Sequence, residues 1–404
     1  MDIERTAVST IKSVSKGFPV LLLTGMRQTG KTYLLKKIME PRRKYVSLDN
    51  PDERELAKNH PDIFLKRHSP PVLIDEVQYA PDLFTYIKIH VDTYNRNGLF
   101  WLTGSQKFNL MKGINETLAG RIAILDLLGL SYREMVQKPK SRPFLPSMDL
   151  QKNNTEKPMG LLNLYRTIWN GSYPRLFVNK GKNRAVFYRS YLQTYIERDI
   201  KDYQGIVDSV KFFKFIRASA VRTGSLLNYA NLARDADIDV RTAKTWLAAM
   251  ERSGLVKLLY PYYTNITKRM VKTPKLYFMD TGLCSYLGGF DTPKSLEAGY
   301  LNGAMLETWA FIEILKSYWH NGLEPLIYYY RDTDQREIDF IIERNMTLYP
   351  IEVKKTSVPT ADNAKNFSLL EKLKKPVGIG AILCLRPSAL PVNQKVIALP
   401  VWDV

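Results

Sequence analysis

The chain begins with a hydrophobic pattern that alternates between two periods. Short, mostly apolar runs occupy residues 20–23, 44–48, 72–74 and 99–102, with a candidate fifth run at 123–128. Between them lie amphipathic stretches such as 33–39 and 82–95, in which apolar side chains recur every three or four positions. Apolar strands that alternate with amphipathic helices are typical of a parallel β-sheet covered on both faces. The pattern therefore predicts an N-terminal α/β domain.

The pattern changes three times further along the chain. Residues 137–158 contain four prolines among Lys, Ser and Asn, which favours a loop or linker. A helical stretch rich in Tyr and Arg follows at 161–203, and residues 210–261 read as helix, turn, helix, strand. Residues 301–385 read as helix, three strands, helix, strand. These changes predict four parts, namely residues 1–136, 137–205, 206–290 and 291–404.

A glycine-rich segment follows the first predicted strand. Residues 25–32, GMRQTGKT, fit the pattern G-x-x-x-x-G-K-[ST], in which glycines let backbone N–H groups point inward at phosphates. The Lys31 ammonium would reach the β- and γ-oxygens, and the Thr32 hydroxyl would ligate magnesium. The next helix would direct its positive N-terminal end at the same phosphates. The segment predicts ATP and Mg²⁺ as cofactors.

Two carboxylates end the third predicted strand, in the run Val72-Leu-Ile-Asp75-Glu76. Parallel strands present their carboxyl ends at one edge, so this pair is expected beside the phosphates. Asp75 would hold the magnesium shell, and Glu76 would align and polarise the attacking water. A glutamate here favours hydrolysis over phosphoryl transfer to a small molecule. The rival class, a small-molecule P-loop kinase, would differ in its product.

Further polar residues complete the predicted nucleotide site. Ser105 is favoured as the hydroxyl that senses the γ-phosphate, with Thr103 as its rival. Arg121 is a candidate for stabilising transition-state charge, in its own subunit or in a neighbour, and is otherwise a surface arginine. The predicted catalytic residues are Glu76, Lys31 and Arg121. The predicted nucleotide-binding residues are Gly25, Arg27, Gln28, Thr29, Gly30, Lys31, Thr32, Asp75 and Ser105, with Thr32 and Asp75 as magnesium ligands.

A helix–turn–helix pattern occupies residues 226–252, with helices at 226–236 and 240–252 and a short turn between them. The second helix predicts an inward stripe of Val240, Ala243, Trp246, Leu247 and Met250. Its outward residues, Arg241, Thr242, Lys244 and Thr245, have the composition of a helix that reads a DNA groove. A strand and a basic wing follow, with Lys268, Arg269, Lys272 and Lys275. The pattern is typical of a winged helix, which contacts DNA or serves as a packing module between domains.

The C-terminal part brings acidic and basic residues onto neighbouring strands. Asp339 lies in one predicted strand, and Glu352 and Lys354 lie in the next, joined by a turn at 344–346. Period-two alternation places Glu352 and Lys354 on one face. Glu307, on the preceding helix, would add a third carboxylate. Such a set can bind a hard divalent cation and orient a water for phosphodiester attack, or it can form an ordinary salt bridge.

Composition adds partners and location. The chain has 59 Lys and Arg against 40 Asp and Glu, a net charge of +19, which favours a nucleic-acid partner such as DNA over a merely basic protein. Its two cysteines, Cys284 and Cys384, form no disulfide framework or zinc pattern. The N-terminus lacks a signal peptide, and no apolar run reaches the roughly 18 residues of a membrane span. We therefore expect a cytoplasmic protein without membrane partners.

Two resemblances extend these predictions. The segments GMRQTGKTYLLKK, VLIDEVQYAPDLF, WLTGSQKFNL and ETLAGRIAILDLLGLSYREM resemble the AAA-type archaeal ATPase family, from the first strand to the chain end. That resemblance implies an ATPase core, a homo-oligomer such as a ring, and a C-terminal half of unknown role. The order Glu307, Asp339, Glu352-x-Lys354 resembles the restriction-endonuclease-like PD-(D/E)XK superfamily, although Pro-Asp is absent. The Arg198-Asp199 pair also resembles the ATPase family, with packing or an ion pair as its default role.

The expected fold class is α/β: a P-loop NTPase parallel sheet, a helical and winged-helix region, and a restriction-endonuclease-like α/β domain. The expected function is that of an ATP-hydrolysing protein that acts on DNA through the winged helix and the nuclease-like domain. The alternative is an ATP-dependent regulatory switch whose nuclease fold is inactive and binds a protein or DNA.

Overall fold

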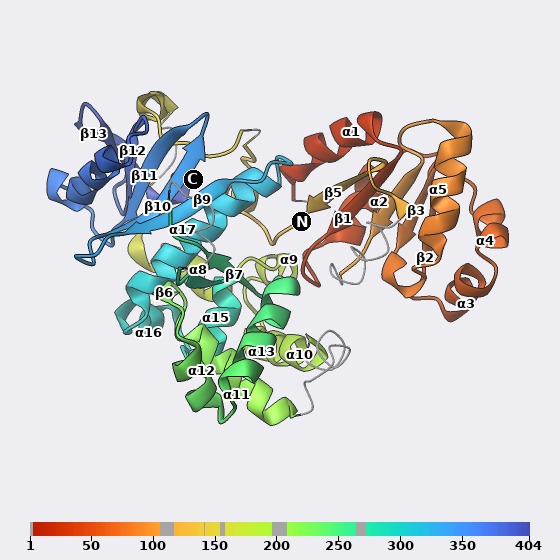
Figure 1. Ribbon diagram of the computed structural model, residues 1–404, viewed down its shortest axis with the longest axis horizontal. Coiled ribbons are helices and arrows are strands. Elements are labelled where there is room, and N and C mark those ends of the chain that lie inside the picture. Colours follow the sequence, from red (N-terminus) through yellow and green to blue (C-terminus); the bar gives the residue numbers. More distant parts are fainter. Residues whose placement is uncertain (1–2, 106–116, 141, 154–157, 196–207, 264–271) are drawn as a thin grey trace.

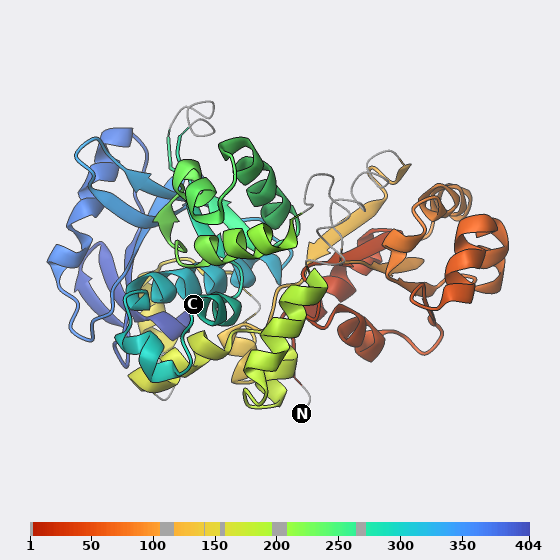
Figure 2. The ribbon, with the colours of Figure 1, turned by 90° about the horizontal axis from the view of Figure 1, so that it is seen from below.

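The molecule carries two large sheets at opposite ends, with helices between them (Figure 1 and Figure 2). The computed structural model describes residues 3–105, 117–140, 142–153, 158–195, 208–263 and 272–404. The predicted residues Arg198, Asp199, Lys268 and Arg269 lie outside this description. Among the described residues, no helix is both long enough and apolar enough to cross a membrane.

The N-terminal sheet has five parallel strands in the order β2-β3-β4-β1-β5. Alternate residues of β1 pack on opposite faces: Val20 and Leu22 contact the core under α5, whereas Leu21 and Leu23 contact the core under α1 and α2. The predicted parallel sheet with two covered faces is confirmed. The strands are β1 (Val20–Thr24), β2 (Lys44–Ser47), β3 (Val72–Asp75), β4 (Phe100–Thr103) and β5 (Ile122–Asp126). The helices are α1 (Ala7–Gly17), α2 (Lys31–Ile38), α3 (Pro51–Asn59), α4 (Pro61–Arg67), η1 (Val77–Tyr79), α5 (Leu83–Tyr94) and α7 (Tyr132–Met135).

Several short helices follow the first sheet. The helix predicted over 161–203 is divided, because Gly171 ends the first helix with φ of 77° and Pro174 begins the next. The segment 137–158 is more than a linker, since Phe144 is buried and its N–H donates to Ser317 Oγ at 3.0 Å. The elements are η2 (Met148–Asn153), α8 (Leu161–Asn170), α9 (Pro174–Val178) and α10 (Arg184–Tyr195).

The next part combines helices with a three-stranded antiparallel sheet of order β6-β8-β7. In α13 the predicted inward residues Ala243, Trp246, Leu247 and Met250 are buried, but Val240 is exposed because it opens the helix. The elements are α11 (Ser209–Ala220), β6 (Ser225–Leu226), α12 (Tyr229–Ala236), α13 (Val240–Arg252), β7 (Val256–Leu259), β8 (Lys275–Phe278), α15 (Thr281–Leu287) and α16 (Pro293–Ala298).

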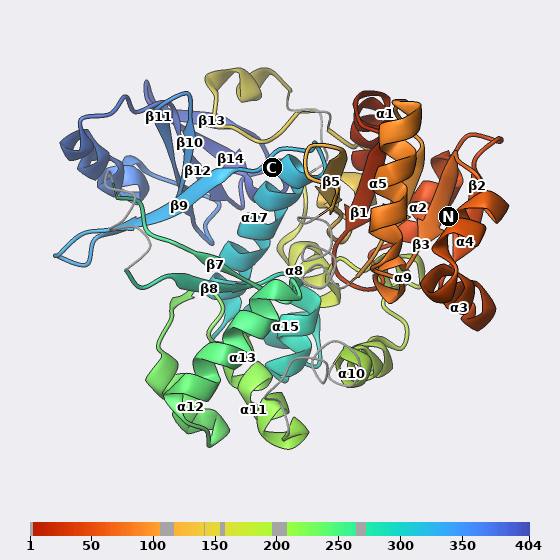
Figure 3. The same cartoon turned by 45° about the vertical axis from the view of Figure 1, so that its right-hand side comes forward.

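The C-terminal sheet has six strands in the order β13-β14-β12-β11-β10-β9. The predicted β10–β11 hairpin is present, and Asn345 and Met346 both have positive φ in its turn, as a two-residue hairpin requires. The predicted helix before β12 is a 3₁₀ helix, and β13 and β14 were not predicted. Figure 3 shows α17 between this sheet and the N-terminal domain. The elements are α17 (Asn302–Trp319), β9 (Leu326–Arg331), β10 (Glu337–Arg344), β11 (Thr347–Val353), η4 (Ala361–Leu373), β12 (Gly380–Cys384), β13 (Leu390–Asn393), β14 (Val396–Pro400) and η5 (Val401–Asp403).

Candidate functional site

The glycine-rich loop lies between β1 and α2, at the carboxyl edge of the first sheet. Gly25 has φ of 134°, and a Cβ there would lie 2.3 Å from the carbonyl oxygen of Leu127, so only glycine fits. Gly30 has φ of 92° at the residue before α2, and Gln28 also has positive φ. The loop therefore curls as the sequence pattern predicts.

Lys31 is buried at the start of α2. Its Nζ donates to the carbonyl oxygens of Gly25 at 2.9 Å and Met26 at 2.7 Å, so the ammonium is held against the loop. Thr29 is also buried and bonds Met26 within the loop, whereas Arg27 is partly exposed. The positive charge and the curled backbone are thus assembled in one place.

Asp75 ends β3 beside Thr32 of α2. The Thr32 hydroxyl donates to Asp75 Oδ1 at 2.7 Å, and the Thr103 hydroxyl at the end of β4 bonds the same oxygen. Tyr45 OH lies 3.4 Å from Asp75 Oδ2, and burial followed by the Asp75 charge raises the pKa of this phenol. A hydroxyl and a carboxylate are oxygen ligands of the kind that Mg²⁺ prefers. The predicted magnesium pair fits.

Glu76 follows Asp75 with φ of 56°. Its N–H donates to Thr103 Oγ1 at 3.2 Å, and its carboxylate accepts from Ser105 Oγ at 3.4 Å and from Gln78 Nε2. The structure therefore brings both candidate hydroxyls to the acidic pair. Thr103, the rival in sequence reasoning, contacts both acidic residues, whereas Ser105 contacts Glu76. Gln78 had no predicted role in the site.

Arg121 does not lie near this loop in its own chain, which corrects the prediction for the same subunit. It precedes β5, and its carbonyl accepts the N–H of Val20 at the start of β1. Because β1 and β5 are parallel, Arg121 lies at the amino edge of the sheet, opposite the loop. Its guanidinium pairs with Asp92 of α5 at 2.5 Å. A role in a neighbouring subunit stays a prediction.

A cavity of about 320 Å³ adjoins the glycine-rich loop at Gly30 and is lined in part by Tyr33 and Leu34 of α2. It lies between the N-terminal segment, the first turns of α2, and α9. Sequence reasoning missed it because its walls come from segments far apart in the chain. Its lining includes Ile3, Gly30, Tyr33, Leu34, Pro174 and Arg175.

The second predicted cluster lies where β10 and β11 pair. The Lys354 ammonium contacts Glu352 Oε1 at 2.6 Å, and Asp339 Oδ2 accepts the N–H of Val353 at 2.8 Å. The N–H of Asp339 lies 3.5 Å from Glu352 Oε2. Asp339 and Glu352 are both buried. The structure therefore brings Asp339, Glu352 and Lys354 together as predicted.

Lys275 contradicts its predicted place in an exposed wing. It is the first residue of β8, it is only 3% exposed, and its Nζ lies 3.0 Å from Glu307 Oε1 and 2.5 Å from Glu337 Oε1. Tyr277 OH donates to the same Glu307 oxygen at 2.5 Å. The prediction failed because a strand that opens after a basic loop can point its first side chain inward. We call Glu307, Glu337, Asp339, Glu352, Lys275 and Lys354 the carboxylate–lysine cluster.

Burial dominates the protonation of this cluster. It raises the pKa of Glu307 to about 7, aided by the charge of Asp339 and opposed by Lys275. It raises the pKa of Glu352 to about 8, again aided by Asp339 and opposed by Lys354. The pKa of Asp339 also rises through burial, against both ammonium groups. Within the described chain, no three acidic, His or Cys side chains are arranged to hold a metal ion. The predicted metal set of Glu307, Asp339 and Glu352 therefore does not fit.

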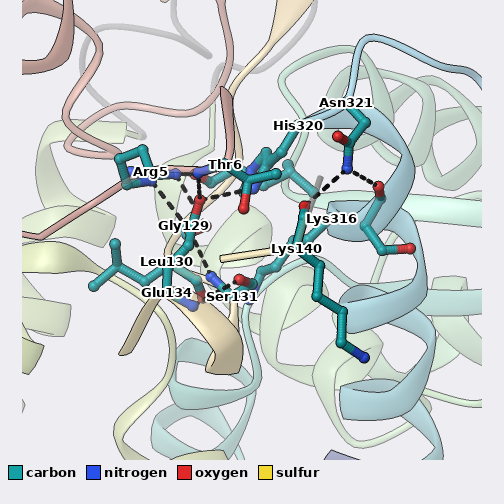
Figure 4. A network of polar contacts seen from close by, with 12 residues as sticks. Arg5, Thr6, Gly129, Leu130, Ser131, Glu134, Lys140, Lys316, His320 and Asn321 are labelled. Atoms are coloured by element: carbon teal, nitrogen blue, oxygen red, sulfur yellow. Dashed lines mark hydrogen bonds and ion pairs between the residues drawn. The ribbon is translucent and has the colours of Figure 1, made fainter. Parts of the chain in front are cut away.

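A buried polar network around Glu134 joins Arg5 to the end of α17 (Figure 4), and Arg5 also contacts the glycine-rich loop. Arg5 donates to the carbonyl oxygen of Thr29 at 3.1 Å, and its Nε lies 3.1 Å from Glu134 Oε2. The other Glu134 oxygen lies 3.3 Å from His320 Nδ1, just after α17. Burial alone would raise the pKa of Glu134, but Arg5 and His320 hold it well below its ordinary range. Sequence reasoning missed this network because its members are scattered.

Three segments match known families. Residues 17–136 match an AAA domain, residues 162–294 match a domain of unknown function (DUF8612), and residues 302–404 match another domain of unknown function (DUF4143). Together with the loop geometry, the first match identifies an AAA-type ATPase-like domain at the N-terminus.

Two curated relatives are similar along nearly the whole chain. They are the uncharacterized proteins Rv2008c of Mycobacterium tuberculosis and Mb2031c of Mycobacterium bovis, each 28% identical over 398 residues, which span 98% of this chain and 83% of the relative. Among solved structures, the RuvB Holliday junction branch migration motor of Thermotoga maritima is 15% identical, with a TM-score of 0.31 and coverage of 63% of this chain and 89% of that one. The STAND protein PH0952 of Pyrococcus horikoshii is 11% identical, with a TM-score of 0.29 and coverage of 79% and 48%.

Proposed function

We propose that this protein binds ATP with Mg²⁺ and hydrolyses it at the loop between β1 and α2. The observation that carries the proposal is the arrangement at one sheet edge: Lys31 is held against the glycine-rich loop, and the next residue, Thr32, bonds Asp75 of β3, which adjoins Glu76. This combination of ammonium, hydroxyl and two carboxylates is the set that phosphoryl transfer to water requires.

Each residue has a distinct task in this proposal. Lys31 would leave the loop carbonyls and pair with phosphate oxygens, and Thr32 and Asp75 would hold the magnesium ion. The bound ion would neutralise charge on the phosphates. Glu76 would orient a water molecule and take its proton. Thr103 would position the acidic pair, since its hydroxyl donates to the Asp75 carboxylate and accepts the backbone N–H of Glu76.

The cavity beside α2 supports a nucleotide in preference to inorganic polyphosphate. Its volume of about 320 Å³ suits a nucleoside, and it adjoins Gly30 at the end of the loop. The exposed Tyr33 ring would supply a stacking face, and Arg175 of α9 would supply a hydrogen-bond donor. A nucleotide placed there would contact both the first domain and the helical region.

Two variants test the assignment. Lys31→Ala should abolish ATP binding in calorimetry, because it removes the ammonium that faces the phosphates. Glu76→Gln should bind ATP as the parent does but release phosphate more slowly, on the order of 10²-fold or more. Equal binding and turnover in both variants would show that the site is misplaced. A phosphorylated acceptor in place of free phosphate would show a kinase.

We further propose that the part predicted at 206–290 contains a winged helix, which includes α11, α12, α13 and the strands β6, β7 and β8, and that α13 contacts DNA. The element order and the β6-β8-β7 sheet support this proposal, as do the exposed Arg241 and Lys244 on α13 and the net charge of +19. ATP turnover measured with and without duplex DNA tests the proposed ATP hydrolysis and the proposed DNA contact together. ATP turnover that does not change at any DNA concentration would favour the alternative, in which the winged helix is a packing module between domains.

The second candidate function is a regulatory ATP switch whose C-terminal domain binds DNA or protein without cutting it. The observation that favours it is Lys275, which pairs with Glu307 and Glu337 inside the carboxylate–lysine cluster. Incubation of plasmid DNA with the protein and Mg²⁺ or Mn²⁺ distinguishes this switch from the nuclease expected from the sequence. Cleavage that is lost in Lys354→Ala supports a nuclease, whereas intact plasmid with continuing ATP hydrolysis supports the switch.

A further inference from the structure

The carboxylate–lysine cluster contains its own cations. Lys275 enters from β8, a strand of the middle sheet, and reaches Glu307 on α17 and Glu337 on β10. Its side chain is only 4% exposed. The cluster is thus closed by a residue that the nuclease-like order Glu307, Asp339, Glu352, Lys354 does not include.

The other members of the cluster also have partners. Glu307 accepts from Tyr277, and Asp339 accepts a backbone N–H of β11. Lys354 contacts Glu352, so each carboxylate already meets a cation or a donor. A divalent ion would need several of these oxygens at once, and it would have to lie close to a buried ammonium of like charge. That arrangement is electrostatically unfavourable in a low-dielectric site.

We infer that the ammonium of Lys275 is the resident cation of this cluster and excludes a divalent metal ion while β8 is paired in its sheet. Glu307, Glu337 and Asp339 then hold β8 against α17 and β10 by charge. The backbone of β8 is fixed on both sides by β6 and β7, so Lys275 does not leave without disturbing the middle sheet. The inference concerns the cluster that resembles a nuclease site in the sequence, and it rests on the proposed switch, in which the C-terminal domain does not cut DNA; it is independent of ATP hydrolysis.

Removing this charge should open a metal site. Lys275→Met keeps the length of the apolar stem but removes the ammonium that pairs with Glu307 and Glu337. The carboxylates left without it should be drawn together by a bound cation, although they are not arranged as metal ligands in the parent. We expect nucleotide-free Lys275→Met to bind one more Mn²⁺ per chain than the parent, measured by calorimetry and by the loss of the free-Mn²⁺ electron paramagnetic resonance signal. Lys272→Met, an exposed lysine three residues earlier, is the matched control and should bind as the parent does.

A second variant, Asp339→Asn, gives a readout that does not depend on whether Lys275→Met folds. Asp339→Asn should leave Mn²⁺ binding by the otherwise unchanged protein as it was, because no metal occupies the cluster while Lys275 is present. A parent chain that loses one bound Mn²⁺ on Asp339→Asn would overturn the inference, as would a folded Lys275→Met that gains none. Because no nucleotide is present, neither result tests the proposed ATP hydrolysis.

Discussion

Thr103 and Ser105 lie two residues apart at the end of β4 but contact the acidic pair differently. Thr103 bonds both Asp75 and the backbone of Glu76, whereas Ser105 reaches only the Glu76 carboxylate at 3.4 Å. We expect Thr103→Val to slow phosphate release by about 10-fold or more, since a hydrogen bond to a charged group contributes about 1.5–3 kcal/mol. Ser105→Ala should slow it less. ATP binding by calorimetry is the control, and the reverse ranking would favour Ser105 as the sensor.

Gly25 is constrained by its surroundings as well as by its backbone. Its φ of 134° disfavours any side chain, and an added Cβ would lie 2.3 Å from Leu127 O. Gly25→Ala should therefore lower the free energy of unfolding by roughly 1–3 kcal/mol or shift the loop. Gly120→Ala is the matched control, because Gly120 has φ of 77° with open space around it. Urea unfolding compares the two, and equal losses would remove any special role of the Leu127 contact.

The sequence predicted single residues well where one chemistry demands one residue type. Lys31, Thr32 and Asp75 were placed correctly relative to one another, because phosphate and magnesium binding fix both the types and the spacing. The prediction that Arg121 lies at the nucleotide site of its own subunit was wrong. Which edge of a sheet a residue occupies depends on strand direction, and β5 was only a candidate strand in the pattern.

At the scale of elements, α13 carries the proposed DNA contact. Arg241 and Lys244 are exposed on the face opposite the buried Ala243 and Trp246. Replacing both basic residues by Ala should weaken duplex binding and reduce the slope of log K against log salt by roughly 2, one for each lost phosphate contact. Fluorescence anisotropy at several salt concentrations measures this. The double change Lys66→Ala, Arg67→Ala, at two exposed positions of α4, removes the same charge as a control. An equal loss there would indicate non-specific attraction.

Elements were predictable where local signals agreed. The β10–β11 hairpin follows from two alternating strands and a short turn, and it places Asp339 beside Glu352. The helix predicted over 161–203 failed because Gly171 and Pro174 interrupt a pattern that is otherwise helical. The prediction that Lys275 is exposed failed for another reason. A lysine beside a basic loop looks solvated, and only tertiary packing against α17 reveals its carboxylate partners.

At the scale of the whole molecule, Arg5 connects the glycine-rich loop with the C-terminal half. It donates to Thr29 in the loop and pairs with Glu134, which in turn faces His320 after α17. Lys316 of α17 also donates to the carbonyl oxygen of Leu130 at 2.7 Å. If the proposed nucleotide binding shifts the loop, we expect the shift to reach α17 through these contacts. No sequence pattern marks such a path, because residues 5, 134 and 320 share no local signal.

The same network makes stability depend on pH. Burial lowers the pKa of His320 despite its contact with Glu134, so the folded chain resists protonating a ring that the unfolded chain protonates below about 6.5. The unfolded state then binds more protons, and the free energy of unfolding falls as pH falls below that value. Glu134, whose pKa is lowered, adds a further loss below about 4.5, where the unfolded carboxylate becomes protonated.

His320→Gln should separate these two effects, because glutamine can still face Glu134 but does not titrate. We expect its thermal unfolding midpoint to change less than that of the parent between pH 7.5 and pH 5, while both proteins lose stability at lower pH. Differential scanning fluorimetry across this range measures the midpoints. His60→Gln, at an exposed histidine, should follow the parent profile. A His320→Gln profile parallel to that of the parent would mean that the buried ring does not set the acid sensitivity of the interface between the two halves.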